Sequence, residues 1–191
     1  MTLSRGDIEQ RAQQVLWNAD AIFAPVDIVK VAASLGATVH YQAFEDHVSG
    51  VLAVQGGARH ILINKTHHPN RQRFTAAHEC GHLVLHHGDK QSDGLFIDTQ
   101  MHVYKRVGVP SSVDYTSRES TTTPAQEREA NLFASAILMP APLLTRAIES
   151  IDHDLDEDDI TSLATTFGVS AQAMSIRLQN LGLLSVQPLD E

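Results

Sequence analysis

The chain reads Arg73-Phe74-Thr75-Ala76-Ala77-His78-Glu79-Cys80-Gly81-His82-Leu83 in its first half, and this segment has the spacing of a helix that binds a metal ion. Positions four apart in a helix stack about 6 Å from one another, one turn above the other. The imidazoles of His78 and His82 can therefore reach one ion at the usual bond length of about 2.0–2.1 Å. The two histidines predict a metal site on this helix.

Glu79 directly follows the first histidine, so its side chain is expected beside the ion rather than on it. A carboxylate in that place can take a proton from a metal-bound water, whose pKa the ion lowers to about 7. We therefore interpret Glu79 as a general base and the segment as the metal helix of a zinc hydrolase.

The residues after the motif narrow the class of zinc hydrolase to which the motif can belong. His86 continues the four-residue spacing, but it lies about 12 Å along the helix from His78, so one ion cannot bind both. We expect His86 and His87 to be solvated residues of the last turn, followed by Gly88 as the C-cap. Gly88 also stands where the astacin-like and matrix-protease class has a third histidine, so that class is excluded.

A catalytic zinc usually has three protein ligands, and the third is predicted on a later helix. Thr123 is a plausible N-cap there, with Pro124 at the first helical position and Gln126 completing a capping box. Glu127 is the ligand candidate, whereas Glu129 lies about 200° around the helix and is expected in solvent. The alternative is that Glu127 merely pairs with a surface arginine or lysine.

The rest of the chain predicts an α+β fold with a small sheet and a helix-rich exterior. The other expected helices cover about residues 5–19 and 25–35, and the expected strands cover 38–43, 48–54 and 60–64. The last two strands should form a hairpin. An extended peptide could add to the edge of this sheet and be presented to the metal.

Residues 91–122 are polar and rich in turn-forming residues, and a connection of this length is often a functional lid. Four side chains in it could donate a hydrogen bond to the oxyanion of a cleaving peptide, or could be ordinary surface groups. They are His102, Tyr104, Tyr115 and Arg118, and the sequence does not choose among them.

The C-terminal part has the helix, turn and helix arrangement of a DNA-reading motif, over residues 159–167 and 171–180. Residues 151–191 contain one arginine, Arg177, against eight acidic residues, so their net charge is −7 without His153. A phosphate backbone would be repelled by this balance, and we expect no direct DNA binding. We assign residues 1–150 to a core and 151–191 to a helical C-terminal extension packed on it.

Composition agrees with a soluble enzyme of one-domain size. The 191 residues contain no apolar run near the roughly 20 residues of a membrane span, and the first residues lack a signal-peptide pattern. The single cysteine, Cys80, points away from the histidine face and is expected to be a packed side chain. We expect a cytoplasmic protein with no membrane partner.

Several blocks together resemble the ImmA/IrrE-type metallopeptidases, a bacterial and phage family. The two signature blocks are residues 73–82 and 127–140, and weaker similarity covers residues 25–36, 50–64 and 167–183. Residues 93–122 depart from the compact pattern of the family. The resemblance extends over most of the chain.

The resemblance implies a zincin fold of the gluzincin type, with His78, His82 and Glu127 as metal ligands and Glu79 as the general base. It implies a zinc ion, although manganese also suits two imidazoles and a carboxylate. It further implies cleavage of a helix-turn-helix repressor in response to stress or DNA damage. The competing hypothesis is a DNA- or protein-binding regulator that keeps a structural or sensory metal site.

Overall fold

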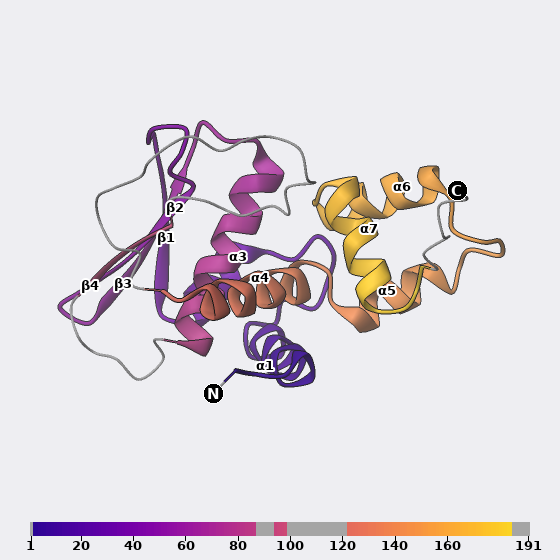
Figure 1. Ribbon diagram of the computed structural model, residues 1–191, viewed down its shortest axis with the longest axis horizontal. Helices are drawn as coiled ribbons and strands as arrows, with labels where there is room; N and C mark the ends of the chain where they lie inside the picture. The colour runs from indigo at the N-terminus through magenta and orange to yellow at the C-terminus, as the bar shows by residue number, and fades with distance from the viewer. Residues whose placement is uncertain (1, 87–93, 99–121, 185–191) are drawn as a thin grey trace.

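The computed structural model describes residues 2–86, 94–98 and 122–184. This part of the chain combines four strands with seven helices, so the α+β class is confirmed (Figure 1). The helices are α1 (Arg5–Asn18), α2 (Ile28–Ser34), α3 (Pro69–Leu85), α4 (Pro124–Leu138), α5 (Ala141–Ile148), α6 (Glu157–Phe167) and α7 (Ala171–Asn180). The strands are β1 (Ala37–Gln42), β2 (Gly50–Gln55), β3 (Ala58–Asn64) and β4 (Gly94–Asp98).

The strands form one sheet in the order β1-β3-β2-β4, in which β1 is parallel to β3 and the other pairs are antiparallel. The β2–β3 hairpin agrees with the sequence-based prediction. β4 was not predicted, because it lies in the segment that reads as polar and turn-rich. Gly50 pairs with Ile63 on one side and with Asp98 on the other, so β4 occupies the edge of β2.

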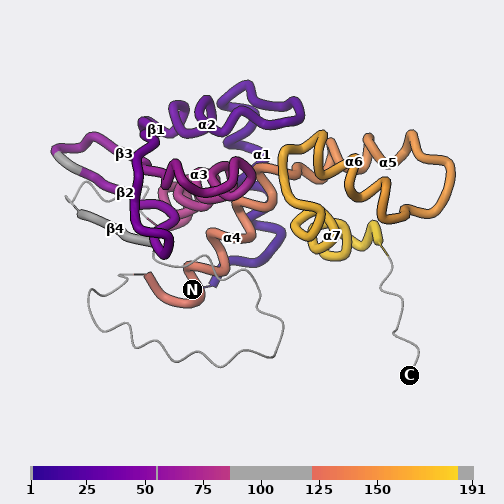
Figure 2. Tube along the Cα trace, turned by 90° about the horizontal axis from the view of Figure 1, so that it is seen from above, coloured from indigo at the N-terminus to yellow at the C-terminus, as the bar shows by residue number. Residues whose placement is uncertain are grey.

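Helix α3 lies in the middle of the molecule, against the inner face of the sheet. Figure 2 shows it between α2 on one side and α4 on the other. Leu52, Ile61 and Ile63 of the sheet are fully buried, as are Ala76 and Ala77 of α3. The face of the helix that carries the histidine motif is therefore part of the protein interior.

The ends of the early helices follow from their caps. The Ser4 side chain accepts a hydrogen bond from the backbone N–H of Asp7 and completes a capping box with it, which starts α1 where the sequence indicates. The expected start of α2 at Pro25 is wrong by three residues. Asp27 is the N-cap, because its side chain accepts from the backbone N–H groups of Val29 and Lys30.

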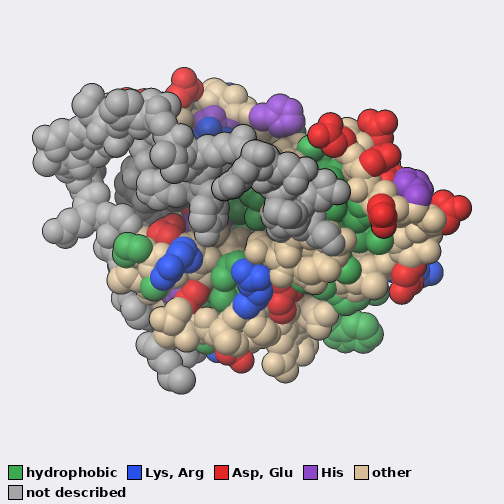
Figure 3. All heavy atoms as spheres, turned by 45° about the vertical axis from the view of Figure 1, so that its right-hand side comes forward, with side chains coloured by type: hydrophobic (Ala, Val, Ile, Leu, Met, Phe, Trp, Pro, Cys, Tyr) green, Lys and Arg blue, Asp and Glu red, His purple; other side chains and the backbone are tan. Residues whose placement is uncertain are grey.

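Helices α5, α6 and α7 form a group at the other end of the molecule from the sheet (Figure 1). Asp156 caps α6, and Gly168 ends it at a φ of 64°, where a side chain would be strained. Exposed acidic residues precede and begin α6, and Figure 3 shows acidic side chains clustered at this end of the molecule. The acidic run is therefore a solvent-exposed connection that also caps α6, and α5 was not anticipated from the sequence.

Buried arginine contacts and apolar packing join this group to the rest of the chain. Arg177 of α7 is 2% exposed, forms a bidentate ion pair with Glu9 of α1 and donates to the backbone oxygen of Met139. Arg73 of α3 donates to the backbone oxygen of Gly168. Apolar residues of α6 and α7 join the same buried cluster as those of α3 and α4. The division of the chain at residue 150 stays a prediction.

No single helix among the described residues is long and apolar enough to cross a membrane. Only α4 and α5 together reach that length and composition, across a bend of 46°.

Candidate metal site

Three side chains with metal-binding atoms meet between α3 and α4. His78 and His82 are 1% and 4% exposed, and the Glu127 side chain is 27% exposed. The Nε2 atoms of the two histidines are 2.9 Å apart, and they lie 3.3 and 3.4 Å from the two carboxylate oxygens of Glu127. The structure therefore brings together all three residues that the sequence selects as ligands.

The orientation of the His78 ring is set by Asn131, one turn after Glu127 on α4. The Nδ1 atom of His78 lies 3.0 Å from Oδ1 of Asn131. An amide oxygen can only accept, so Nδ1 carries the ring proton, and in the neutral ring this leaves the lone pair on Nε2. That lone pair faces His82 and Glu127, as metal coordination requires.

The donor set has the dimensions of a small tetrahedral site. Ligands bound at about 2.1 Å in a tetrahedron are separated from each other by about 3.4 Å. The distances of 3.3 and 3.4 Å from the histidines to Glu127 match this edge, whereas the 2.9 Å between the two Nε2 atoms is shorter. All the candidate ligand atoms lie within 4.8 Å of one another. Two imidazoles and one carboxylate around this space fit a divalent ion such as zinc.

The carboxylate of Glu127 is in the charged form that a ligand needs. Its burial acts to raise the pKa, but the adjacent side chains of His78, His82 and Thr122 lower the pKa well below the ordinary glutamate value. Among the residues that the structure describes, its charged-group neighbours are the two histidines and no arginine or lysine pairs with it.

Glu79 lies beside this group, not within it. Its side chain is 1% exposed, and its Oε1 atom faces the backbone of Gly50 at the start of β2. A carboxylate next to a metal site, held in the interior, can exchange protons with a water there. The position agrees with the role of general base, which remains a prediction.

The expected exposure of His86 and Glu129 is wrong, because both side chains are buried at 5% and 7% exposure. The Nε2 atom of His86 lies 3.7 Å from Oε2 of Glu129, and Oε1 of Glu129 accepts from the backbone N–H of Leu3. The helical period correctly placed Glu129 on the face of α4 opposite Glu127. The N-terminal segment, distant in sequence, covers that face.

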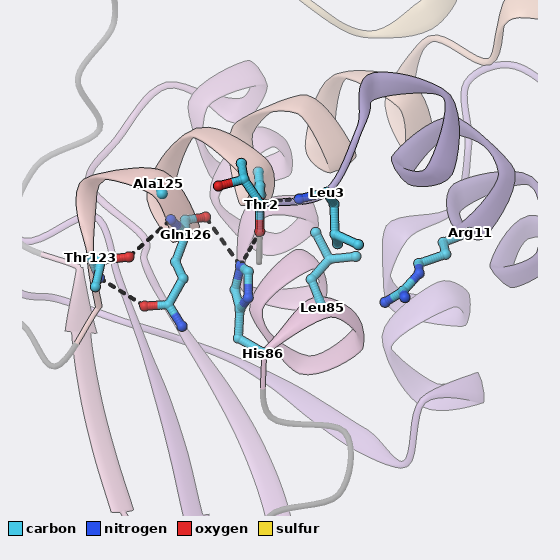
Figure 4. Close-up of a pocket in the computed structure, with 9 residues that line it drawn as sticks. Thr2, Leu3, Arg11, Leu85, His86, Thr123, Ala125 and Gln126 are labelled. Atoms are coloured by element: carbon cyan, nitrogen blue, oxygen red, sulfur yellow. Dashed lines mark hydrogen bonds and ion pairs between the residues drawn. The ribbon is translucent and has the colours of Figure 1, made fainter.

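Figure 4 shows the surroundings of this buried pair, where the N-terminal segment meets the end of α3 and the start of α4. A cavity of about 350 Å³ lies here, lined among others by Leu3, Arg11, Leu85 and His86. Burial and the neighbouring His82 lower the pKa of His86. The ring of His86 also contacts that of His82, with centroids 5.4 Å apart.

Cys80 is a fully buried side chain on the opposite face of α3, as expected. Burial and the nearby Glu79 carboxylate raise the pKa of its thiol. A neutral thiol in the core is neither a ligand nor a nucleophile.

Other sequence-based candidates lie outside the described residues. They are His87, Gly88, His102, Tyr104, Tyr115 and Arg118. The expected C-cap at Gly88 is wrong, because α3 ends at Leu85 and His86 is its C-cap. A second group of potential ligands, His153, Asp156 and Asp159, caps the exposed start of α6.

Comparison with known proteins identifies the family of this chain. A family model of peptidase family M78, the IrrE N-terminal-like domain, matches residues 32–179. The radiation response metalloprotease IrrE of Deinococcus radiodurans is 36% identical over 89 residues, which are 47% of this chain and 22% of that protein. The alignment thus covers about a fifth of the relative's length. The resemblance predicted from the motif blocks is confirmed, and this chain belongs to the IrrE N-terminal-like family of metallopeptidases.

Proposed function

We propose that this chain is a metal-dependent endopeptidase in which His78, His82 and Glu127 hold a zinc ion and Glu79 is the general base. The observation that supports this most directly is the set of three buried or half-buried donors within 4.8 Å of one another. A carboxylate that is not part of this set lies next to it in the interior.

A zinc ion bound to these three residues supplies a water of lowered pKa and polarises the carbonyl of the bond to be cleaved. Glu79 takes one proton from the attacking water at its carboxylate. The same residue returns that proton to the nitrogen of the leaving amine as the C–N bond breaks. The products are a carboxylic acid and an amine, and one water is consumed.

Asn131 keeps the lone pair of His78 directed at the ion, and the fully ionised Glu127 supplies a negative ligand. Two imidazoles and one carboxylate favour zinc over magnesium or calcium, which prefer oxygen ligands. Manganese fits the same donors less well and is the alternative ion.

We propose a helix-turn-helix transcriptional repressor as the substrate and a stress response as the setting. The substrate is the one that the resemblance to ImmA/IrrE-type proteins implies, and the stress setting is supported by the relative in Deinococcus radiodurans, a radiation response metalloprotease by name. A cytoplasmic location, as expected from the sequence, is part of the same proposal.

The proposal has this chain act on a repressor protein rather than on DNA. Arg177 is the only lysine or arginine within the described residues 151–184, and it is buried against Glu9. No basic side chain of that part is therefore available to a phosphate backbone.

The test is cleavage of the helix-turn-helix protein encoded nearest to this gene, by purified protein with and without one equivalent of zinc. Glu79→Gln should keep its metal but lose at least 100-fold in rate, because it lacks the base. His78→Ala, His82→Ala and Glu127→Ala should each lower metal occupancy in elemental analysis.

A regulator with a structural metal predicts a different result. It would leave the repressor intact with metal bound, and it would shift an operator duplex in a gel in a way that requires residues 151–191. Equal rates for wild type and metal-loaded Glu79→Gln would contradict the proposed mechanism.

A further inference from the structure

We propose that Gly50 is a positioning residue for Glu79, and that Asn64 holds it in place through the loop that joins β1 to β2. This inference rests on the proposed function, in which Glu79 is the general base. It assigns a role in the reaction to two residues of the sheet that are not among the proposed ligands.

The loop over residues 43–49 is organised around the side chain of Asn64, which is fully buried at the end of β3. Its amide nitrogen donates to the backbone oxygens of Phe44, Glu45 and Val48, at 3.3, 3.2 and 2.9 Å. Its amide oxygen accepts from the backbone N–H of Phe44. One side chain thus satisfies polar groups along the whole loop, which no aliphatic residue could do.

The same residue fixes the exit of the loop. The backbone N–H of Asn64 donates to the backbone oxygen of Ser49 at 3.0 Å. Ser49 is fully buried, and its hydroxyl accepts from the guanidinium of Arg71 at 2.8 Å. The chain then enters β2 at Gly50, next to α3.

The face of α3 that meets this exit consists of residues four apart. Arg71, Thr75 and Glu79 lie on successive turns of the helix. Arg71 binds Ser49, and Thr75 and Glu79 both approach Gly50. The loop is therefore attached to the face of α3 that carries the general base, two turns before Glu79.

The close approach requires glycine for reasons of space. A Cβ atom on Gly50 would lie 2.4 Å from Cγ2 of Thr75 and 3.2 Å from Oε1 of Glu79. The Thr75 methyl cannot rotate away freely, because its hydroxyl donates to the backbone oxygen of Arg71 at 2.9 Å. The positive-φ glycines do not include Gly50, so backbone conformation is not the reason.

The consequence for catalysis follows from distances. Gly50 forms the wall against which the Glu79 carboxylate rests, on the side opposite its backbone. A displacement of a catalytic group by about 1 Å can cost about 100-fold in rate. A methyl group on Gly50 would clash with the Thr75 methyl and press on the Glu79 carboxylate, which lie on the same face of α3.

The experiment compares Gly50→Ala, Thr75→Ser and the double variant. Gly50→Ala should lower kcat for repressor cleavage by about 100-fold, with KM and zinc affinity within about threefold of wild type. Thr75→Ser removes the clashing methyl and keeps the hydroxyl, so alone it should stay near wild type. In the double variant, Thr75→Ser should raise kcat at least about tenfold above that of Gly50→Ala.

A readout without catalysis is the crystal structure of each metal-free variant. The Glu79 carboxylate should be displaced in Gly50→Ala and should return toward its original position in the double variant. An unmoved carboxylate in Gly50→Ala, or a double variant no better than the single one, overturns the proposal. If wild type cleaves nothing while the carboxylate shifts as described, the proposed function fails and the positioning contact stands.

Asn64→Asp gives an independent arm should Gly50→Ala not fold. It replaces the donor to three backbone oxygens by a charged acceptor, so the loop should loosen and kcat should fall with zinc affinity retained. Wild-type kcat in this variant would contradict the role assigned to Asn64.

Discussion

The Nδ1 atom of His78 on α3 lies 3.0 Å from the side-chain oxygen of Asn131 on α4. Glu127 of the same helix lies 3.3 Å from the other ring nitrogen of His78. One histidine is thus held on both sides by residues one turn apart on the neighbouring helix. This links the ring tautomer of a candidate ligand directly to the packing of α3 on α4.

Asn131→Ala should therefore lower zinc affinity by about 10- to 100-fold, the usual effect of removing a group that orients a metal-bound histidine. Competition with a chelating dye measures the dissociation constant. Asn131→Asp should retain near-normal affinity, since a carboxylate also accepts from Nδ1. Asn18→Ala, at an exposed site, serves as the matched control. Unchanged affinity in Asn131→Ala would show that the ring is oriented by something else.

A second prediction concerns the contact that brings the two helices together. A Cβ atom on Gly81 would lie 3.1 Å from both Cα and the backbone oxygen of Ala130, so α4 would have to move. Gly81→Ala should destabilise the protein by about 1–3 kcal/mol and weaken zinc binding by about tenfold. Thermal unfolding and the dye assay report the two effects.

The matched control is Gly6→Ala on α1, where only Oγ of Ser4 lies near the added carbon, at 3.8 Å. Alanine is the better helix former, so this variant should be neutral or more stable by up to about 1 kcal/mol. A similar loss in both variants would rule out the close helix contact as the cause.

The thiol of Cys80 should not react with Ellman's reagent in the folded protein, because burial raises its pKa and blocks access. In denaturant one thiol per chain should react, since the sequence has one cysteine. Cys80→Ala with Ala33→Cys moves the only thiol to an exposed position on α2 and should react at once. Rapid reaction of native Cys80 would mean that the core around α3 opens readily.

The ion pair between Glu9 and Arg177 should matter for stability more than an ordinary surface pair. Glu9→Ala leaves a buried guanidinium with the Met139 carbonyl as its one remaining partner among the described residues, and should cost about 2–3 kcal/mol. Replacing both residues, by leucine and methionine, should recover most of this loss. Urea unfolding of the three variants measures it, and a cost below about 0.5 kcal/mol for Glu9→Ala would refute the prediction.

The features that could be predicted from the sequence are those set by neighbours on one helix or turn. The four-residue spacing of His78 and His82, and the capping box of Thr123 with Gln126, both depend on local geometry. Glu127 could be selected because the helical period places it on the opposite face from Glu129. In each case the structure has the side chains where the period puts them.

The wrong predictions concern which distant segment packs against a given face of a helix or strand. The helical period of the sequence does not give this information. Glu129 is buried because Leu3, 126 residues earlier, donates to it. The close approach of Gly50 to Glu79 likewise depends on a loop that Asn64 holds in place. The sequence around Gly50 does not show this contact. β4 was missed because its pairing with β2 is equally non-local.

The contact between Gly81 and Ala130 also affects how this family can vary. Both candidate ligand helices are positioned by their own packing, so the segment that joins them does not have to set the distance from His82 to Glu127. Loop-closure entropy rises only by about 0.6 kcal/mol for each doubling of length. Relatives could therefore lengthen, shorten or replace this joining segment, and so acquire new substrates, while the metal chemistry stays the same.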